Sequence, residues 1–228
     1  MKTYTAAQMR EAEAPFLAAG VPLMKRASAA LAAETAALLE MRGGVPGARL
    51  LVLAGAGNNG GDAMHAAALL AGQGARVTIV PTASQMHAAG LAAALTAGAA
   101  LLSQDETDAV LAGAARASVV ILDGILGTGT SDSPALRGRA RQTVAAILPV
   151  LHGRAAPLVV AVDLPSGIGV DDGAVPDPVV LPADLTVTFG GCKSGLLREP
   201  AASLAGRIAV ADIGIGEELE RIAARDRG

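Results

Sequence analysis

The sequence predicts an α/β fold with a parallel central sheet. From Arg49 onward, short apolar runs alternate with longer helical patterns, and strands separated in this way pair in parallel through right-handed crossovers. The uninterrupted apolar run Leu50–Ala54 is typical of a strand that is buried on both faces. Gly-rich segments follow the expected strands, at the edge where open α/β sheets bind their ligands.

Two helices are expected before the first strand. Thr5-Ala-Ala-Gln8 has the spacing of a capping box, so the first helix begins at Thr5 and ends by Gly20. A second helix runs from about Leu23 to Met41, with Leu, Met and Ala at helical spacing. These helices are additional to a minimal doubly wound fold, and they either cover the core or form a dimer face.

The remaining elements alternate along one domain that spans residues 1–228. Strands are expected at residues 49–54, 76–81, 118–122, 158–163, 184–189 and 207–211. Helices are expected at residues 61–73, 84–99, 105–115 and 135–150. The residues after VADIGIG are interpreted as a charged tail.

Composition excludes several classes of function. A net charge of −3 provides no basic surface for nucleic acid, and 1% aromatic residues provide no platform for base stacking. The N-terminus has no hydrophobic signal core, and the longest uncharged apolar stretch is too short to span a bilayer. A single cysteine, Cys192, excludes an internal disulfide and fits a reducing compartment. We therefore expect a cytoplasmic protein without a membrane or nucleic-acid partner.

The stretch Arg49–Asp62, which reads RLLVLAGAGNNGGD, predicts a strand, a polar glycine loop and the start of a helix. Glycine allows the backbone to approach a ligand closely, and a helix N-terminus favours a phosphate. Asn58, Asn59 and Asp62 add polar groups that a plain glycine turn does not need. We interpret the loop as a phosphate cradle, and a turn without a ligand is the alternative.

Two familiar nucleotide-binding classes do not fit this loop. The loop matches G-x-G-x-x-G, but no Asp or Glu occurs between Asp62 and Asp105 to bind an adenosine ribose. An NAD-dependent dehydrogenase is therefore disfavoured. The absence of GK[ST] removes the P-loop NTPase interpretation.

Two further buried strands end in aspartate. Asp123 precedes a Gly/Thr loop, and Asp163 precedes the turn Pro165-Ser166-Gly167. An acid at the carboxyl end of a strand points into the ligand crevice, although an aspartate can also cap its own turn. Oxygen donors from Asn59, Asp123 and Ser166 suit a hard cation better than zinc or copper.

A fourth strand and glycine turn carries Lys193, which either faces a phosphate or is solvated. Cys192 has no C-x-x-C partner, and Ser166 lacks a G-x-S-x-G elbow. Thiol and serine-hydrolase chemistry are therefore disfavoured.

The chain carries TAAQMREAE, LVLAGAGNNGGD, ILDGILGTGT, VVAVDLPSGI, ADLTVTFGGCKSGLL and VADIGIG, in that order. In these segments it resembles the NAD(P)H-hydrate epimerase family, the YjeF N-terminal domain. The resemblance implies a Rossmann-like three-layer α/β/α sandwich and, commonly, a homodimer. It also implies interconversion of the R and S forms of hydrated NADH and NADPH, so that an ATP- or ADP-dependent dehydratase can restore the cofactor.

The resemblance also assigns residues by matching motif. Asn59, Asp123 and Ser166 would bind one potassium ion per subunit, and Asp163 would contact the hydrated nicotinamide and transfer protons. The remaining substrate-binding residues would be Asn58, Asn59, Gly60, Gly61, Asp62, Gly127, Thr128, Gly129, Thr130, Ser131, Asp132 and Ser133. The alternatives are a non-catalytic YjeF-like scaffold that binds nucleotide or protein, and a regulator that binds nucleotide phosphate without turnover.

Overall fold

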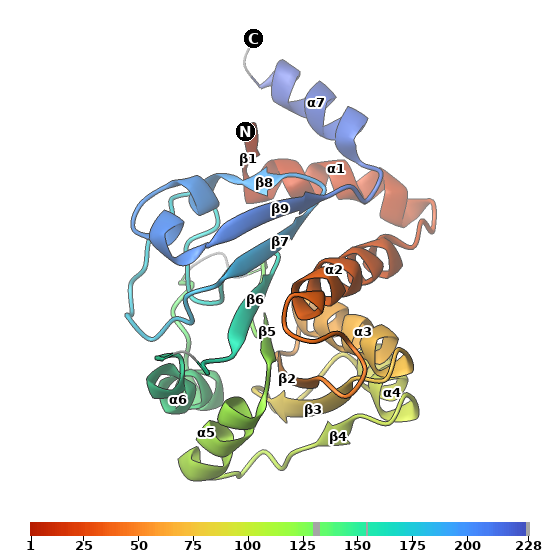
Figure 1. The fold of residues 1–228 in the computed structure, drawn as a ribbon. Coiled ribbons are helices and arrows are strands. Elements are labelled where there is room, and N and C mark those ends of the chain that lie inside the picture. Colours follow the sequence, from red (N-terminus) through yellow and green to blue (C-terminus); the bar gives the residue numbers. More distant parts are fainter. Residues whose placement is uncertain (130–132, 154, 227–228) are drawn as a thin grey trace.

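The structure is a computed structural model that describes residues 1–129, 133–153 and 155–226 (Figure 1). Within these residues, seven parallel strands form the main sheet. In spatial order they are β4 (Ala100–Leu101), β3 (Arg76–Pro81), β2 (Arg49–Ala54), β5 (Val120–Gly124), β6 (Leu158–Val162), β7 (Leu185–Phe189) and β9 (Arg207–Ala211). The predicted parallel sheet is confirmed.

The sheet changes its direction of growth between β2 and β5. The chain adds β3 and β4 on one side of β2, and then returns to place β5, β6, β7 and β9 on the other side. Gly55 continues the pairing by donating its N–H to the carbonyl oxygen of Gly124 at 3.0 Å. Parallel α/β sheets bind ligands at such a reversal, beyond the carboxyl ends of the strands.

Helices cover both faces of the sheet, which gives three layers (Figure 1). The helices are α1 (Ala6–Ala18), α2 (Leu23–Glu40), α3 (Asn58–Gly72), α4 (Ala88–Thr96), α5 (Asp108–Ala117), α6 (Gly138–Ile147) and α7 (Gly216–Arg225). Helices α2, α3 and α4 lie on one side of the sheet and α5 and α6 on the other, while α1 and α7 lie near its β9 end. The Rossmann-like α/β/α architecture with two N-terminal helices is confirmed.

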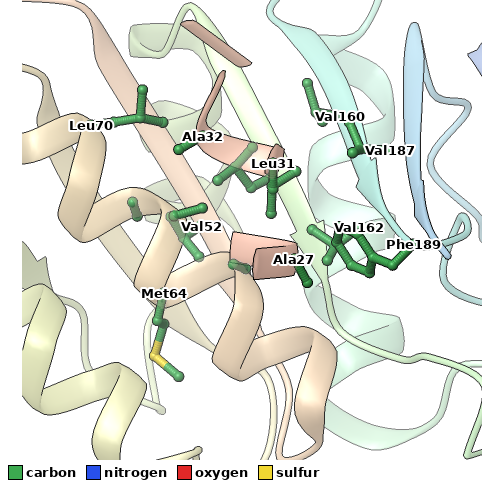
Figure 2. Packing of buried hydrophobic residues seen from close by; sticks show 14 of the residues in the cluster. Ala27, Leu31, Ala32, Val52, Met64, Leu70, Val160, Val162, Val187 and Phe189 are labelled. Atoms are coloured by element: carbon green, nitrogen blue, oxygen red, sulfur yellow. The ribbon is translucent and has the colours of Figure 1, made fainter. Parts of the chain in front are cut away.

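Alternation along the strands builds two separate cores. On β2, Val52 belongs to the core that contains Leu31 of α2 and Leu70 of α3, as Figure 2 shows. Its neighbour Leu53 points to the opposite face and belongs to the core that contains Leu111 of α5. Each fully buried leucine side chain contributes about 1.5–3 kcal/mol relative to exposure, so burial on both faces stabilises the central strands.

Helix α1 begins as its capping box predicts. The Thr5 hydroxyl accepts the N–H of Gln8 at 3.2 Å, and the Gln8 side chain accepts the N–H of Thr5 at 3.0 Å. A carboxylate oxygen of Asp171 accepts the N–H of Ala6 at 2.7 Å and satisfies another donor of the first turn. The start of α1 is therefore held both locally and by a distant loop.

Several predicted boundaries were wrong. Helix α3 begins at Asn58 and not at residue 61, so the two asparagines belong to its first turn. Residues 84–99 contain only the shorter helix α4, and residues 135–150 divide into α6 and the 3₁₀ turn Leu148–Val150. Strand β5 lies two residues later than expected, at Val120–Gly124.

Three short strands and one helix of the described chain were not predicted. The short strand β4 extends the main sheet, and the strands β1 (Thr3–Tyr4) and β8 (Cys192–Lys193) pair in a separate small sheet. The presumed charged tail is helix α7. Strands of two residues carry no readable periodicity, because alternation needs at least four residues to be seen.

In the part of the chain that the structure describes, each helix taken singly is too short or too polar to cross a membrane. The pair α1 and α2 meets the length and composition criteria together, with a bend of 117° between the two helices.

Candidate functional site

A cleft of about 720 Å³ lies beyond the carboxyl ends of β2 and β5. One wall is the segment from Gly55 to Asn59, and the opposite wall is the loop that begins at Ile125. Arg10 and Glu13 of helix α1 complete the lining. The cleft therefore occupies the point where the sheet reverses its direction of growth.

Glycine permits helix α3 to begin close to the sheet. A Cβ atom on Gly60 would lie 2.2 Å from the carbonyl oxygen of Gly55, and one on Gly61 would lie 2.8 Å from the ring of His87. Asn58 and Asn59 line the cleft, whereas Gly60, Gly61 and Asp62 are buried beneath it. The five residues of the predicted cradle thus divide into two that line the cleft and three that do not.

Asn59 connects three parts of the site. Its side-chain amide donates to the carbonyl oxygens of Leu126 at 3.1 Å and of Val162 at 2.5 Å. A Cβ atom on Gly127 would lie only 2.4 Å from the amide oxygen of Asn59. The start of α3 is therefore joined to the loop after β5 and to the end of β6.

Asp123 and Ser166 are almost completely buried beside Asn59. The N–H of Ser166 donates to Asp123 Oδ2 at 2.8 Å, and the Ser166 hydroxyl accepts the N–H of Leu126 at 2.9 Å. The carbonyl oxygen of Leu126 accepts from both Asn59 and the Ser166 hydroxyl. Burial raises the pKa of Asp123, and the hydrogen bonds from Ser166 oppose that rise.

Asn59 and Ser166 therefore meet at the backbone of Leu126, and Asp123 joins them through the N–H of Ser166. They offer an amide, a carboxylate and a hydroxyl, which suits a hard cation. Among the described residues, no three His, Cys, Asp or Glu side chains gather at metal-binding spacing.

Asp163 follows β6 with a positive φ of 71°, a conformation that is uncommon outside glycine. Its Oδ1 atom accepts hydrogen bonds from the Thr188 hydroxyl and the Phe189 N–H, both at 3.1 Å, and from the Lys193 ammonium. Within the described chain, the hydrogen bonds to this carboxylate all end on Oδ1. Oδ2 therefore has no hydrogen-bond partner among the described residues.

Lys193 is 2% exposed, so the two roles expected for it, a phosphate contact or a solvated lysine, were wrong. Its ammonium donates to Asp163 and, at 2.9 Å, to the carbonyl oxygen of Phe189. Lys193 lies on β8, where it pairs with Tyr4 of β1. A buried ammonium needs such partners because an isolated charge is costly to remove from water.

The loop after β5 forms the cleft wall opposite the start of α3. Gly127, Thr128, Gly129 and Ser133 line the cleft. The carbonyl oxygen of Thr128 accepts from the Arg10 guanidinium at 3.4 Å. The predicted residues Thr130, Ser131 and Asp132 lie outside the described residues.

The sequence profile of the family described as "YjeF-related protein N-terminus" matches residues 20–195. The chain belongs to this family. A protein named NAD(P)H-hydrate epimerase from Clavibacter michiganensis subsp. michiganensis is 54% identical over 213 residues, which are 93% of this chain and 90% of that protein. A protein of the same name from Microbacterium testaceum is 48% identical over 96% of this chain and 80% of its own length.

One longer relative is named as a bifunctional enzyme. The bifunctional NAD(P)H-hydrate repair enzyme Nnr of Mycobacterium tuberculosis is 38% identical over 97% of this chain, which covers 45% of that protein. The crystal structure of the yeast protein YNL200c superposes with a TM-score of 0.72 and 23% identity, covering 86% of this chain and 83% of that one. This likeness supports the fold.

The YjeF motifs did not reveal all charged groups at the cleft. Arg10 and Glu13 lie before the matched stretch, and their i, i+3 spacing on one face of α1 is the signal that could have identified them. Burial raises the pKa of Glu13, and nearby Asp163 raises it further, whereas Lys193 and Arg10 lower it. Burial also raises the pKa of Asp62 to about 8, against the lowering effect of the hydroxyl of Ser28, 3.2 Å away.

Proposed function

We propose that this protein is an NAD(P)H-hydrate epimerase that interconverts the R and S forms of hydrated NADH and NADPH. The observation that carries the proposal is the carboxylate of Asp163, which is held through one oxygen. Asp163 directly follows Val162, whose carbonyl oxygen accepts from Asn59 in the lining of the cleft. The relative named NAD(P)H-hydrate epimerase, 54% identical over 90% of its length, supports the same activity.

The substrate would lie along the two walls of the cleft. The first turn of α3, with Asn58 and Asn59, offers free backbone N–H groups and a helix N-terminus to a phosphate. The loop from Gly127 to Ser133 would cover the other side of the substrate. Gly60, Gly61 and Asp62 would support this turn from beneath.

Epimerisation at the carbinolamine carbon requires proton transfer rather than a redox change. The hydroxyl leaves as water, the ring nitrogen stabilises the resulting iminium, and water returns to the opposite face; ring opening to an aldehyde is the other route. Both routes need a group that moves a proton at the hydroxyl oxygen. Asp163 is our candidate, because its Oδ2 has no partner among the described residues.

We also propose one potassium ion per subunit, bound by Asn59, Asp123 and Ser166. The donor set fits because the buried Asp123 carboxylate receives N–H donors from Ser166 and Ile125 but has no cation beside it in the described chain. When bound, the ion would supply the positive charge that balances this carboxylate. Potassium chloride should raise the melting temperature more than choline chloride at equal ionic strength, and Ser166→Ala should remove the difference.

A homodimer, functional coupling to an NAD(P)H-hydrate dehydratase and a cytoplasmic location complete the proposal. The name of the bifunctional mycobacterial relative supports the coupling. Light scattering after size exclusion tests the dimer, since a monomer at micromolar concentration would contradict it. Cell fractionation tests the location.

The activity is tested by mixing the protein with both hydrate epimers, ATP and a separate S-specific dehydratase. We expect complete recovery of the reduced cofactor, because R-form hydrate is converted as S-form hydrate is consumed. Asp163→Asn is expected to fold and to bind ligand but to leave recovery near one half. Recovery of one half with the wild-type protein would contradict the proposal and favour a non-catalytic scaffold.

A further inference from the structure

Helix α1 carries a second carboxyl group to the cleft. Glu13 lines the cleft together with Arg10, one turn earlier on the same face of the helix. The capping box at Thr5 and the Asp171 carboxylate, which accepts the N–H of Ala6, fix the start of α1. The position of Glu13 is therefore set by the fold.

The environment of Glu13 keeps its carboxyl group free for a ligand. The side chain is half-buried, and in the part of the chain that the structure describes no hydrogen bond to its carboxyl group is formed. The charged groups near it are Arg10 on its own helix, Lys193 on β8 and Asp163 after β6. Asp62 of α3 also lies within electrostatic range. Burial is the largest influence on Glu13 and raises its pKa, so its proton is held more tightly than that of an exposed glutamate.

Asp163 has the opposite environment. Three donors, one of them the Lys193 ammonium, converge on its Oδ1 atom. Two carboxyl groups in one site, one surrounded by donors and the other half-buried without them, are the arrangement that separates an acid from a base.

We propose that Glu13 is a second catalytic residue of the epimerisation, acting as the acid where Asp163 acts as the base. This inference rests on the proposed epimerase function and extends it to a residue outside the matched family stretch.

The proposed step conserves atoms and electrons. The Glu13 carboxyl group gives its proton to the substrate hydroxyl, the C–O bond breaks, water leaves, and the lone pair of the ring nitrogen forms the C=N bond of the iminium. Water then adds to the opposite face, a C–O bond forms, the C=N pair returns to nitrogen, and Asp163 accepts the released proton. One proton has moved from Glu13 to Asp163, and exchange with solvent or the reverse reaction restores the starting state.

The test compares Glu13→Gln and Glu13→Asp with Glu11→Gln, a matched change on the same helix that faces α7. Rates are measured on R-form hydrate with an excess of S-specific dehydratase. We expect Glu13→Gln to lower kcat by about 10²-fold or more, the range for loss of a general acid, while KM stays within about threefold. Glu13→Asp should keep part of the rate, and Glu11→Gln should remain near wild type.

The pH profile separates chemistry from structure. In the wild type, kcat/KM should fall as pH rises through the pKa of Glu13, because the acid loses its proton; Glu13→Gln should lack this alkaline limb. Unfolding midpoints show whether each variant is folded. If Glu13→Gln does not fold, Glu13→Asp provides the test, because a carboxyl group at this position should keep the fall in kcat/KM at alkaline pH.

Two results would overturn the inference. One is a kcat for Glu13→Gln within about threefold of wild type, and the other is a loss confined to KM, which is the signature of uniform binding. If Glu13→Gln behaves like wild type while Asp163→Asn is inactive, the inference fails and the proposed function survives. If neither variant loses activity, the roles of both Glu13 and Asp163 fail while the epimerase function survives. If the wild type itself is inactive, the proposed function fails.

Discussion

Lys193 and Asp163 form an ion pair that water barely reaches, with 2% and 7% of their side chains exposed. Such a pair is weak evidence for stability in itself, because removing both charges from water opposes their attraction. Removing one partner is different, since the other charge is left buried and uncompensated. The pair therefore fixes the orientation of the Asp163 side chain more than it stabilises the fold.

We predict that Lys193→Met lowers the free energy of unfolding by about 3–5 kcal/mol, the typical loss when one partner of a buried pair is removed. Lys2→Met is the control, because Lys2 pairs with Glu220 on the surface, where an ion pair contributes about 1 kcal/mol or less. Urea denaturation measures both. The double variant Lys193→Met with Asp163→Asn should recover at least half of the loss, and equal losses in single and double variants would contradict this account.

The residues of the candidate site differ in how well the sequence predicted them. Asp123 lies at the end of β5, Asp163 directly follows β6, and Ser166 lies in the turn after it, so local pattern placed them at the ligand edge of the sheet. The partner of Lys193 lies 30 residues away in the chain. The position of Glu13 near Lys193 and Asp163 depends on contacts between α1 and the last third of the chain. Such long-range contacts have no local periodicity and were missed.

At the scale of elements, helix α3 approaches the sheet through its glycines. Gly60 has the carbonyl oxygen of Gly55 where a Cβ atom would lie, at 2.2 Å. Gly124 of β5 likewise leaves no room, since a Cβ atom there would lie 2.7 Å from Ala63. The close approach places the first turn of α3 beside the cleft, where we propose that the phosphate binds.

Two glycine-to-alanine changes in α3 should therefore have opposite effects. Gly60→Ala should lower the free energy of unfolding by about 1–3 kcal/mol, because the backbone that it meets cannot move away as a flexible side chain would. Gly72→Ala, at the exposed end of the same helix with nothing within 4 Å, should raise it by up to about 1 kcal/mol through helix propensity. Chemical denaturation of both variants measures the difference, and a Gly60→Ala protein as stable as wild type would show that the approach is not tight.

Element types were predicted better than their ends. The spacing of apolar residues predicted the long strands and the amphipathic helices. Helix α7 was missed because most of its residues are polar, and the segment was interpreted as a charged tail. Leu219 and Ile222, three positions apart on α7, are buried in the main core, and this spacing was the signal for a helix.

At the scale of the whole molecule, two sets of acids titrate in separate pH ranges. Exposed acids such as Glu11 and Asp177 have lowered pKa values because of arginine partners, so their contribution is present above the ordinary pKa and is lost on acidification. Glu13 and Asp62 have raised pKa values because of burial, so their contribution is largest in acid and declines as pH rises. The protein should therefore be most stable in mildly acidic solution.

The raised pKa of Asp62 defines the pH range over which the stability should change. In the unfolded chain it ionises near its ordinary pKa of 3.8, whereas in the folded protein its pKa is raised to about 8. Between these values the unfolded state has released a proton that the folded state still holds, so the free energy of unfolding falls as pH rises, by up to about 1.4 kcal/mol per pH unit. The stabilising contribution is complete below pH 3.8 and has been lost above about pH 8.

Asp62→Asn should remove this dependence, because asparagine resembles the neutral acid in shape and can still accept from the hydroxyl of Ser28. Relative to wild type, the variant should become progressively more stable from pH 5 to pH 8, as measured by urea denaturation at each pH. Asp177→Asn is the matched control: its pKa is lowered, so its difference from wild type should stay constant over that range. The expectation would be contradicted if the free energy of unfolding of Asp62→Asn differed from that of the wild type by the same amount at every pH. Asp62 would then be ionised in the folded protein at neutral pH, and the first turn of α3 would cover a buried charge rather than a neutral acid.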